Sequence, residues 1–142
     1  KSEIEADWVW GTFFMTRSDI IHQFPQQKFP DDYFLYYEDV QWCYLIKQMN
    51  FRIIYDPSYA VIHHLSASSP GDEWEKTFRK LQLSTLHEAD FFQKQKGKPY
   101  VFVLYLVRGF KYLSLRKKKF IKIAFFYFRF MFKGGQHLRK VN

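Results

Sequence analysis

The first part of the chain alternates between apolar runs typical of strands and apolar stripes typical of helices. Residues 8–17 (WVWGTFFMTR) are rich in aromatic and β-favouring side chains and predict a buried strand. Gly11 interrupts this run, and a glycine within a strand indicates a bulge or the close approach of another group. Ser18 is a favourable N-cap and predicts a short helix that ends before Pro25.

An aromatic segment and a second helix follow. Residues 33–37 (YFLYY) predict an extended segment. From about Val40 to Met49, apolar residues recur at positions i, i+3, i+4 and i+7, which predicts a helix with one face toward a core. Asn50 tolerates the left-handed backbone conformation that often ends a helix. The apolar stripe consists of Trp42, Leu45, Ile46 and Met49.

Two more strands and a long helix are predicted next. Residues 51–55 and 59–64 predict two short strands, separated by the turn sequence of residues 56–58 (DPS). Asp72 is in a position to cap a long helix that ends at Gly97. The apolar face of this helix consists of Trp74, Phe78, Leu81, Thr85, Ala89 and Phe92.

The end of the chain predicts two helices, at about residues 100–115 and 117–133, that interleave aromatic with basic residues. Residues 100–142 hold 11 Lys and Arg and no acidic residue, whereas residues 1–99 hold 11 basic and 14 acidic residues. This asymmetry indicates an anionic partner, either a membrane or a nucleic acid. Neither helix has the roughly 18 uninterrupted apolar residues that a membrane span needs. We expect residues 100–133 to lie on an anionic membrane surface; the alternative is that both helices pack on the rest of the protein.

The bulk composition adds two limits. The 142 residues suffice for a modest domain with a real core. Cys43 is the single cysteine, so no internal disulfide can form, which is typical of a reducing compartment. The sequence begins with Lys1 rather than methionine, which fits a piece of a longer protein.

Three motifs follow one another in an informative order. They are a glycine-containing strand with a trailing arginine (DWVWGTFFMTR), an aromatic segment with an acidic pair at a helix start (FLYYEDVQWC), and a strand pair ending in histidine (FRIIYDPSYAVIHH). Together they resemble the second half of family-2 glycosyltransferases, especially rhamnosyltransferase-like bacterial enzymes that build surface polysaccharides. The resemblance covers about residues 7–97. It implies an α/β fold class: the acceptor-side half of a GT-A (nucleotide-diphospho-sugar transferase) fold, a short mixed sheet with flanking helices, followed by basic amphipathic helices.

The resemblance implies an inverting transfer of sugar from a nucleotide-sugar donor to a saccharide or lipid-linked saccharide acceptor, with Asp39 as general base. An aspartate is ionised at neutral pH and can take the proton of the incoming hydroxyl as the new bond forms. The simpler alternative is that Asp39 caps the helix that follows. Glu38 is expected to orient the site or bind the acceptor, or to be a surface acid. The family often has a further Asp where this chain has Gln41.

Other site residues also follow from the resemblance. Trp8, Trp10 and Gly11 would form a platform for the acceptor, because aromatic faces pack well on sugar rings, although we expect a core role for at least one tryptophan. Tyr37, next to the acidic pair, is expected to contact substrate. Arg17 would bind a diphosphate, and a structural ion pair is its alternative.

A divalent metal, Mg²⁺ or Mn²⁺, is expected in the complete enzyme, with His63 as a metal or diphosphate ligand. A neutral imidazole suits these cations poorly without carboxylates, and the sequence has no D-x-D motif. The alternative is a hydrogen-bonded histidine at a strand end. A glycine-rich phosphate loop and a first βαβ half are also missing, so we expect this chain not to transfer sugar by itself.

We expect residues 1–97 to form the acceptor and catalytic-base part, and residues 98–142 a basic helical tail. The complete enzyme is expected in the cytoplasm, peripheral on the inner face of a bacterial plasma membrane, and no nucleic acid is expected as a partner. Two other classes stay open: a nucleic-acid-binding module that uses the basic aromatic tail, and a non-catalytic remnant of the fold.

Overall fold

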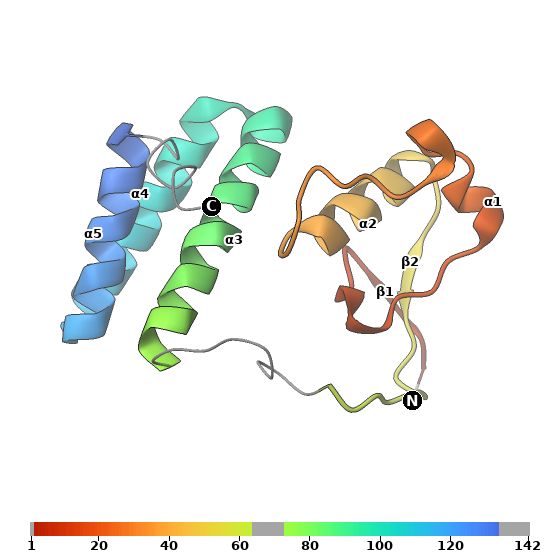
Figure 1. Ribbon diagram of the computed structural model, residues 1–142, viewed down its shortest axis with the longest axis horizontal. Helices are drawn as coiled ribbons and strands as arrows, with labels where there is room; N and C mark the ends of the chain where they lie inside the picture. The colour runs from red at the N-terminus through yellow and green to blue at the C-terminus, as the bar shows by residue number, and fades with distance from the viewer. Residues whose placement is uncertain (1, 64–72, 134–142) are drawn as a thin grey trace. The chain divides into compact units, whose positions relative to one another are not determined.

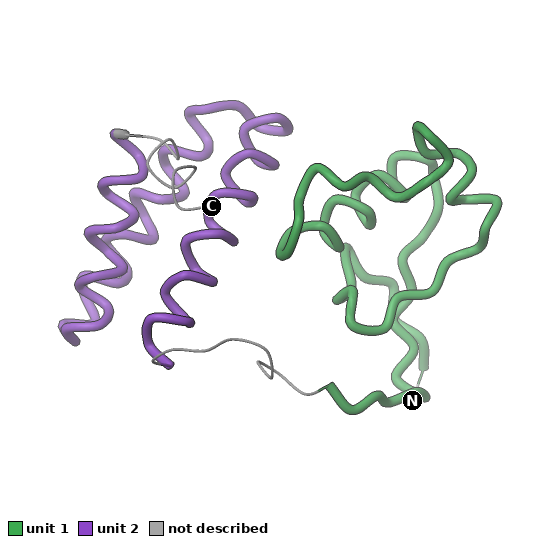
Figure 2. Tube along the Cα trace, in the orientation of Figure 1, with its two compact units in different colours: residues 1–70 green, residues 71–142 purple. Residues whose placement is uncertain are grey.

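A computed structural model describes residues 2–63 and 73–133. The chain forms two compact units, residues 1–70 (unit 1) and residues 71–142 (unit 2), each with its own hydrophobic core (Figure 2). The described residues are mostly helical and include one two-stranded antiparallel sheet, which is compatible with an α/β class. The expected mixed sheet is wrong for this part of the chain, because its two strands pair antiparallel only.

Unit 1 packs a helix against the small sheet (Figure 1). Strands β1 and β2 pair with Glu5 opposite Ile54. The predicted second helix and the turn after it are confirmed, because α2 ends one residue before Met49 and Asn50 has a φ of 64°. The elements of unit 1 are β1 (Ile4–Ala6), a 3₁₀ helix (Gly11–Phe13), α1 (Ser18–Ile21), a second 3₁₀ helix (Pro25–Gln27), α2 (Glu38–Gln48) and β2 (Ile53–Tyr55).

The core of unit 1 forms around one face of α2. Cys43 and Ile46 are buried there, and burial raises the pKa of the Cys43 thiol. Trp42 stacks on Phe29 with ring centroids 4.6 Å apart, and its indole N–H donates to the Pro30 carbonyl over 2.9 Å. The predicted apolar stripe of this helix is therefore confirmed. Ile20, Phe24 and Ile53 complete the buried cluster.

Four predictions for unit 1 are wrong. Residues 8–17 form no strand but a 3₁₀ turn flanked by irregular chain, because the Gly11 N–H bonds to a side chain instead of a neighbouring strand. Residues 33–37 are not extended, since they include a left-handed run. Residues 59–63 are irregular as well, and His64 lies outside the described residues. Ser18 is the first residue of α1 rather than its cap, which is Arg17.

Unit 2 consists of three helices, as far as the structure describes it: α3 (Glu73–Lys96), α4 (Lys98–Ser114) and α5 (Lys118–Lys133) (Figure 1). The long helix and both basic helices are thus confirmed, while the predicted cap at Asp72 lies outside the described residues. Close approach of α4 and α5 requires Gly109, because an added Cβ would lie 2.6 Å from the Phe128 ring. The buried core consists of Ala89, Tyr105, Ile123, Phe126, Tyr127 and Phe130.

A buried polar group connects α3 with α4. The Tyr105 hydroxyl donates to Glu88 Oε2 over 2.8 Å, and Arg108 forms an ion pair with the same carboxylate. Burial, followed by the charge of Glu88, raises the pKa of Tyr105. Arg108, one of the basic residues of α4, is therefore a structural residue.

The compact units divide after Pro70, and α3 belongs with the basic helices because its apolar face packs on them. A functional boundary at residue 97 stays a prediction. The alternative to membrane binding for residues 100–133 is that both helices pack on the rest of the protein. The structure supports part of it, since one side of α4 and α5 packs on α3. Within the described residues, no helix is both long enough and apolar enough to cross a membrane.

Candidate functional site

The start of α2 meets the segment that contains Gly11. The Gly11 N–H donates to Asp39 Oδ2 over 3.1 Å, and the Val40 N–H donates to Asp39 Oδ1 over 2.8 Å. A Cβ added to Gly11 would lie 3.5 Å from Asp39 Cβ, which is ordinary van der Waals contact. The predicted close approach at Gly11 is therefore an approach by Asp39, and it brings together two predicted site residues that are distant in sequence.

Asp39 is not the N-cap residue of α2, but its Oδ1 does accept a free N–H of the first turn, that of Val40, so part of the alternative role is observed. The N-cap of α2 is Tyr37, which has a φ of 76° and makes no capping hydrogen bond with its side chain. Glu38 and Asp39 occupy the first turn of the helix, where the partial positive charge of the helix end stabilises carboxylates. Leu35, Tyr36 and Tyr37 precede this turn with three consecutive positive φ values, a conformation that costs energy for residues with a Cβ.

One carboxylate oxygen of Glu38 lacks a hydrogen-bond donor in the part of the chain that the structure describes. Its Oε2 is buried and has no hydrogen-bond partner among the described residues, and the same is true of Gln41 Oε1. The Gln41 amide donates to Asp32 Oδ2 over 2.5 Å. Burial, followed by the negative charge of Glu38, raises the pKa of Tyr36. A buried acceptor without a donor is costly, and Glu38 Oε2 is too enclosed here for the hydroxyl group of a ligand to reach it.

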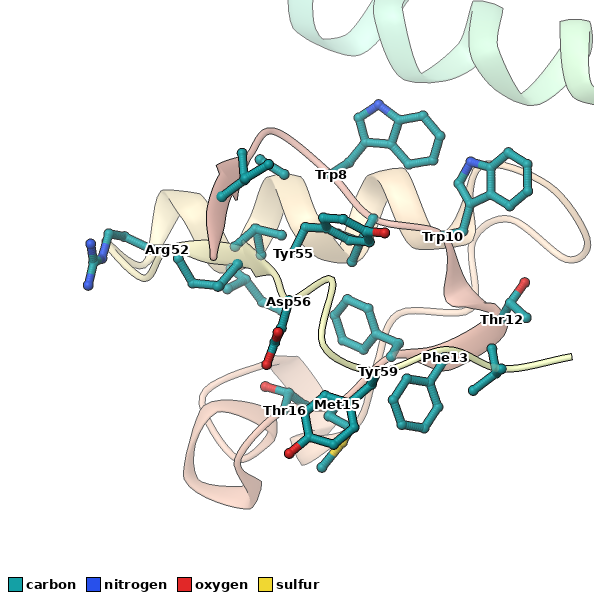
Figure 3. Close-up of a pocket in the computed structure, with 18 of the residues that line it drawn as sticks. Trp8, Trp10, Thr12, Phe13, Met15, Thr16, Arg52, Tyr55, Asp56 and Tyr59 are labelled. Carbon is teal, nitrogen blue, oxygen red and sulfur yellow. The ribbon is translucent and has the colours of Figure 1, made fainter. Parts of the chain in front are cut away.

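A cleft of about 1080 Å³ opens within unit 1. Trp8 and Trp10 lie along one edge, and Met15, Thr16 and Tyr59 lie along the opposite edge (Figure 3). Its volume is at the upper end of the range for small-molecule sites. Other lining residues include Ile4, Thr12, Phe13, Arg17, Ile20, Arg52, Tyr55, Asp56, Val61 and His63.

Both tryptophans of the expected acceptor platform line this cleft and are exposed, Trp10 at 65% of its surface. The expectation that at least one of them belongs to the core is therefore wrong. Gly11 lies between two lining residues, Trp10 and Thr12, but is not itself part of the wall. Exposed indole faces are available to pack on a flat apolar ligand surface.

Asp39, Glu38 and Tyr37 do not line the cleft. The structure thus divides the predicted site into an acidic pair at the start of α2 and an aromatic cleft, connected through the hydrogen bond at Gly11. Sequence reasoning missed Tyr59, Arg52 and Asp56 as cleft residues. The sequence indicates only a turn role for Asp56. This role is confirmed, because its carboxylate accepts the Ser58 N–H over 2.9 Å.

Arg17 lines the cleft but has a partner already. Its Nε donates to Asp19 Oδ1 over 2.9 Å, and its Nη2 contacts Asp19 Oδ2. This bidentate pair lowers the pKa of Asp19, chiefly through the hydrogen bond. The alternative of a structural ion pair is therefore the one observed, and a diphosphate would have to compete with Asp19.

His63 also lines the cleft, but the described residues do not make a metal site around it. Asp56 is the acidic residue that shares the cleft wall with His63. Among the residues that the structure describes, no three His, Cys, Asp or Glu side chains gather closely enough to hold a metal ion. Mg²⁺ and Mn²⁺ prefer several oxygen ligands, so these residues do not fit such an ion by themselves.

Comparisons with protein-family models, with characterised proteins and with solved structures found no match to this chain. The resemblance to family-2 glycosyltransferases therefore stays a prediction from its three motifs.

Proposed function

We propose that this chain is the acceptor-side part of an inverting glycosyltransferase, with Asp39 as its general base. The observation that carries the proposal is the hydrogen bond from the Gly11 N–H to Asp39 Oδ2. It joins the first two motifs of the resemblance, although 28 positions separate the two residues. Asp39 thereby gains a defined position beside the segment that carries Trp10.

Asp39 keeps the capacity to accept a proton in this position. A carboxylate oxygen has two lone pairs, and each oxygen of Asp39 accepts one backbone N–H. A lone pair on each oxygen is therefore left for an incoming hydroxyl group. An inverting transfer is a single displacement, and it needs a base of this kind on the face of the sugar opposite to the leaving group.

In this proposal, the cleft binds the acceptor and Glu38 orients the site. The faces of Trp8 and Trp10 would pack on sugar rings, and Glu38, outside the cleft wall, would hold the start of α2 beside Asp39. The acceptor is a saccharide or a lipid-linked saccharide in the synthesis of a bacterial surface polysaccharide. Tyr37 would support this site through the left-handed turn that begins α2.

The nucleotide-sugar donor and its Mg²⁺ or Mn²⁺ ion would belong mainly to a donor-binding half. His63 would then be one ligand that this chain adds to a metal site formed mainly by the donor-binding half. We further propose that the complete enzyme is a peripheral protein on the cytoplasmic face of the plasma membrane.

Asp39→Asn, in an enzyme that includes a donor-binding half, tests the proposal. The asparagine oxygen can still accept the Gly11 N–H, but its amide group then faces the Val40 N–H and cannot take up a proton. Release of nucleoside diphosphate from a panel of nucleotide sugars should fall by about 10²-fold or more, whereas the lost Val40 hydrogen bond should lower the free energy of unfolding by only about 1 kcal/mol.

The matched control is Asp31→Asn, which neutralises an exposed aspartate that pairs with Lys28. It should keep full turnover. Unchanged turnover in the Asp39→Asn variant would exclude Asp39 as the base, and would remove the main support for sugar transfer.

A further inference from the structure

We propose that the outer face of α4 and α5 docks on a bilayer that contains anionic phospholipid. We define the outer face as Phe102, Val103, Val107 and Phe110 of α4 with Phe125 and Phe132 of α5. The proposal goes beyond sugar transfer and does not depend on it. It also assigns the expected membrane contact of residues 100–133 to particular side chains.

The six residues of the outer face form one continuous surface. Phe102 and Phe132 meet at one end, with ring centroids 6.2 Å apart. Phe110 meets Phe128 at 5.4 Å, and Phe128 lies one helical turn from both Phe125 and Phe132. The helices α4 and α5 pack directly on each other (Figure 1). These two ring contacts therefore join the exposed side chains of both helices.

The outer face is apolar and accessible. Its six side chains have between 42% and 78% of their surface exposed, whereas the opposite sides of both helices are buried in the core of unit 2. Large exposed apolar patches usually mark a surface that a partner covers. Aromatic side chains are well suited to the region between headgroups and acyl chains, where one side of an interfacial helix is buried.

Charge favours an anionic partner, and a membrane with anionic headgroups fits both this charge and the apolar outer face. Lys111 follows Val107 by one turn and Arg129 follows Phe125 by one turn, so both cations border the outer face. Residues 116–119 (RKKK) are exposed at one end of it. Residues 100–142 contain no acidic side chain that could neutralise these cations from the same helices.

Two further physical points support a membrane rather than a second copy of this chain. Lysines at the start of α5 lie at the positive end of the helix, an unfavourable position that anionic headgroups would compensate. Two copies that met through this face would bring their basic borders together, and like charges repel across an interface. Long Lys and Arg side chains can instead extend from the apolar face toward phosphate groups.

Flotation of the full chain with lipid vesicles tests the proposal. It should float with vesicles of phosphatidylcholine and phosphatidylglycerol, and binding should fall at least about fivefold with phosphatidylcholine alone. The double variant Val107→Ser/Phe125→Ser should weaken binding to the anionic vesicles by about tenfold or more, because it removes apolar contact area. Lys111→Gln/Arg129→Gln should weaken binding to the anionic vesicles at low salt, and its difference from the unchanged chain should shrink as salt is raised, because salt screens the attraction that these charges provide.

Matched controls make the same chemical changes elsewhere. Phe34→Ser changes an exposed phenylalanine of unit 1, and Arg79→Gln changes an exposed arginine of α3. Both should bind like the unchanged chain. Circular dichroism and thermal unfolding check that each variant is folded.

A second measurement replaces a single exposed residue and leaves the rest of the outer face unchanged. Cys43 is buried, so a fluorescent thiol label can be placed selectively on Val107→Cys or, as a control, on the exposed Thr77→Cys. When anionic vesicles are added, the emission of the label at position 107 should shift to the blue, and the emission of the label at position 77 should not. Equal shifts at both positions, or binding unaffected by the double variant, would overturn the proposal. So would a dimer that dissociates in the double variant, or a stronger binding to single-stranded oligonucleotides that vesicles fail to displace.

Discussion

Glu88 is an acid inside the helical unit, and specific partners compensate for its burial. Its side chain is 12% exposed, against 35% for its partner Arg108. Arg108 Nη2 donates to Glu88 Oε1 over 3.0 Å, and the Tyr105 hydroxyl donates to Oε2. The loss of one partner from such a pair costs more than the loss of both, because an uncompensated charge is left in the interior.

Arg108→Met should therefore lower the free energy of unfolding by about 2–4 kcal/mol, somewhat less than for a fully buried pair because Arg108 is partly exposed. The double variant Glu88→Leu/Arg108→Met should recover much of this loss. Urea unfolding followed by circular dichroism measures both. Arg79→Met, at an exposed site on α3, is the control and should change stability little. Equal losses in the single and double variants would contradict a buried, compensated pair.

Among the elements, the left-handed run before α2 is one that local sequence preferences do not favour. Leu35, Tyr36 and Tyr37 have φ values of 64°, 70° and 76°. Each such residue costs about 1 kcal/mol relative to a right-handed one, unless it is glycine or, to a lesser degree, asparagine. Strained backbone persists where surrounding contacts impose it, and such positions occur often at functional sites. Here the run leads directly into Glu38 and Asp39.

Leu35→Asn should raise the free energy of unfolding by about 0.5–1 kcal/mol, because asparagine tolerates positive φ and the Leu35 side chain is half exposed. Chemical unfolding of unit 1 measures the change. Leu115→Asn is the matched control: Leu115 has similar exposure but an ordinary φ of −73°, so no gain is expected there. A gain at both positions would indicate a general effect of lost apolar surface instead of relieved backbone strain.

At the scale of the whole molecule, each unit has its own core and its own chemistry. Unit 1 holds the acidic pair and the aromatic cleft, and unit 2 holds the basic outer face. The chain contains 11 of its 22 basic residues after position 99, where no acid occurs. The proposed base and the proposed membrane surface therefore belong to different units and can be tested separately.

The 142-residue chain by itself should not release nucleoside diphosphate from any nucleotide sugar. Its sequence has neither a glycine-rich phosphate loop nor a D-x-D motif, and the described residues hold no three-residue metal site. Coupled detection of released diphosphate measures this, with an intact glycosyltransferase as the positive control. Turnover by the isolated chain, lost in the Asp39→Asn variant, would show that the site is more complete than we propose.

The periodicity of apolar residues along the sequence was sufficient to predict the helices. The stripe of α2 and the apolar face of α3 are local patterns, and burying one side of a helix satisfies them whatever the partner is. The same is true of Asn50 and of the turn at Asp56, where a single side chain determines the backbone. Strands were predicted poorly, because a strand forms only when another segment offers its hydrogen bonds. Residues 8–17 and 59–63 have strand-like composition but no such neighbour among the described residues.

For the candidate site, the sequence by itself determined the residue types: an acidic pair at the start of a helix, a glycine that another group approaches, and aromatic residues on either side of that glycine. Only the tertiary structure decided which group approaches Gly11, that Arg17 is paired with Asp19, and that Arg108 belongs to the interior. The reason is that helix and turn preferences act over a few residues, whereas the partner of a charge or of a backbone N–H comes from a distant part of the chain.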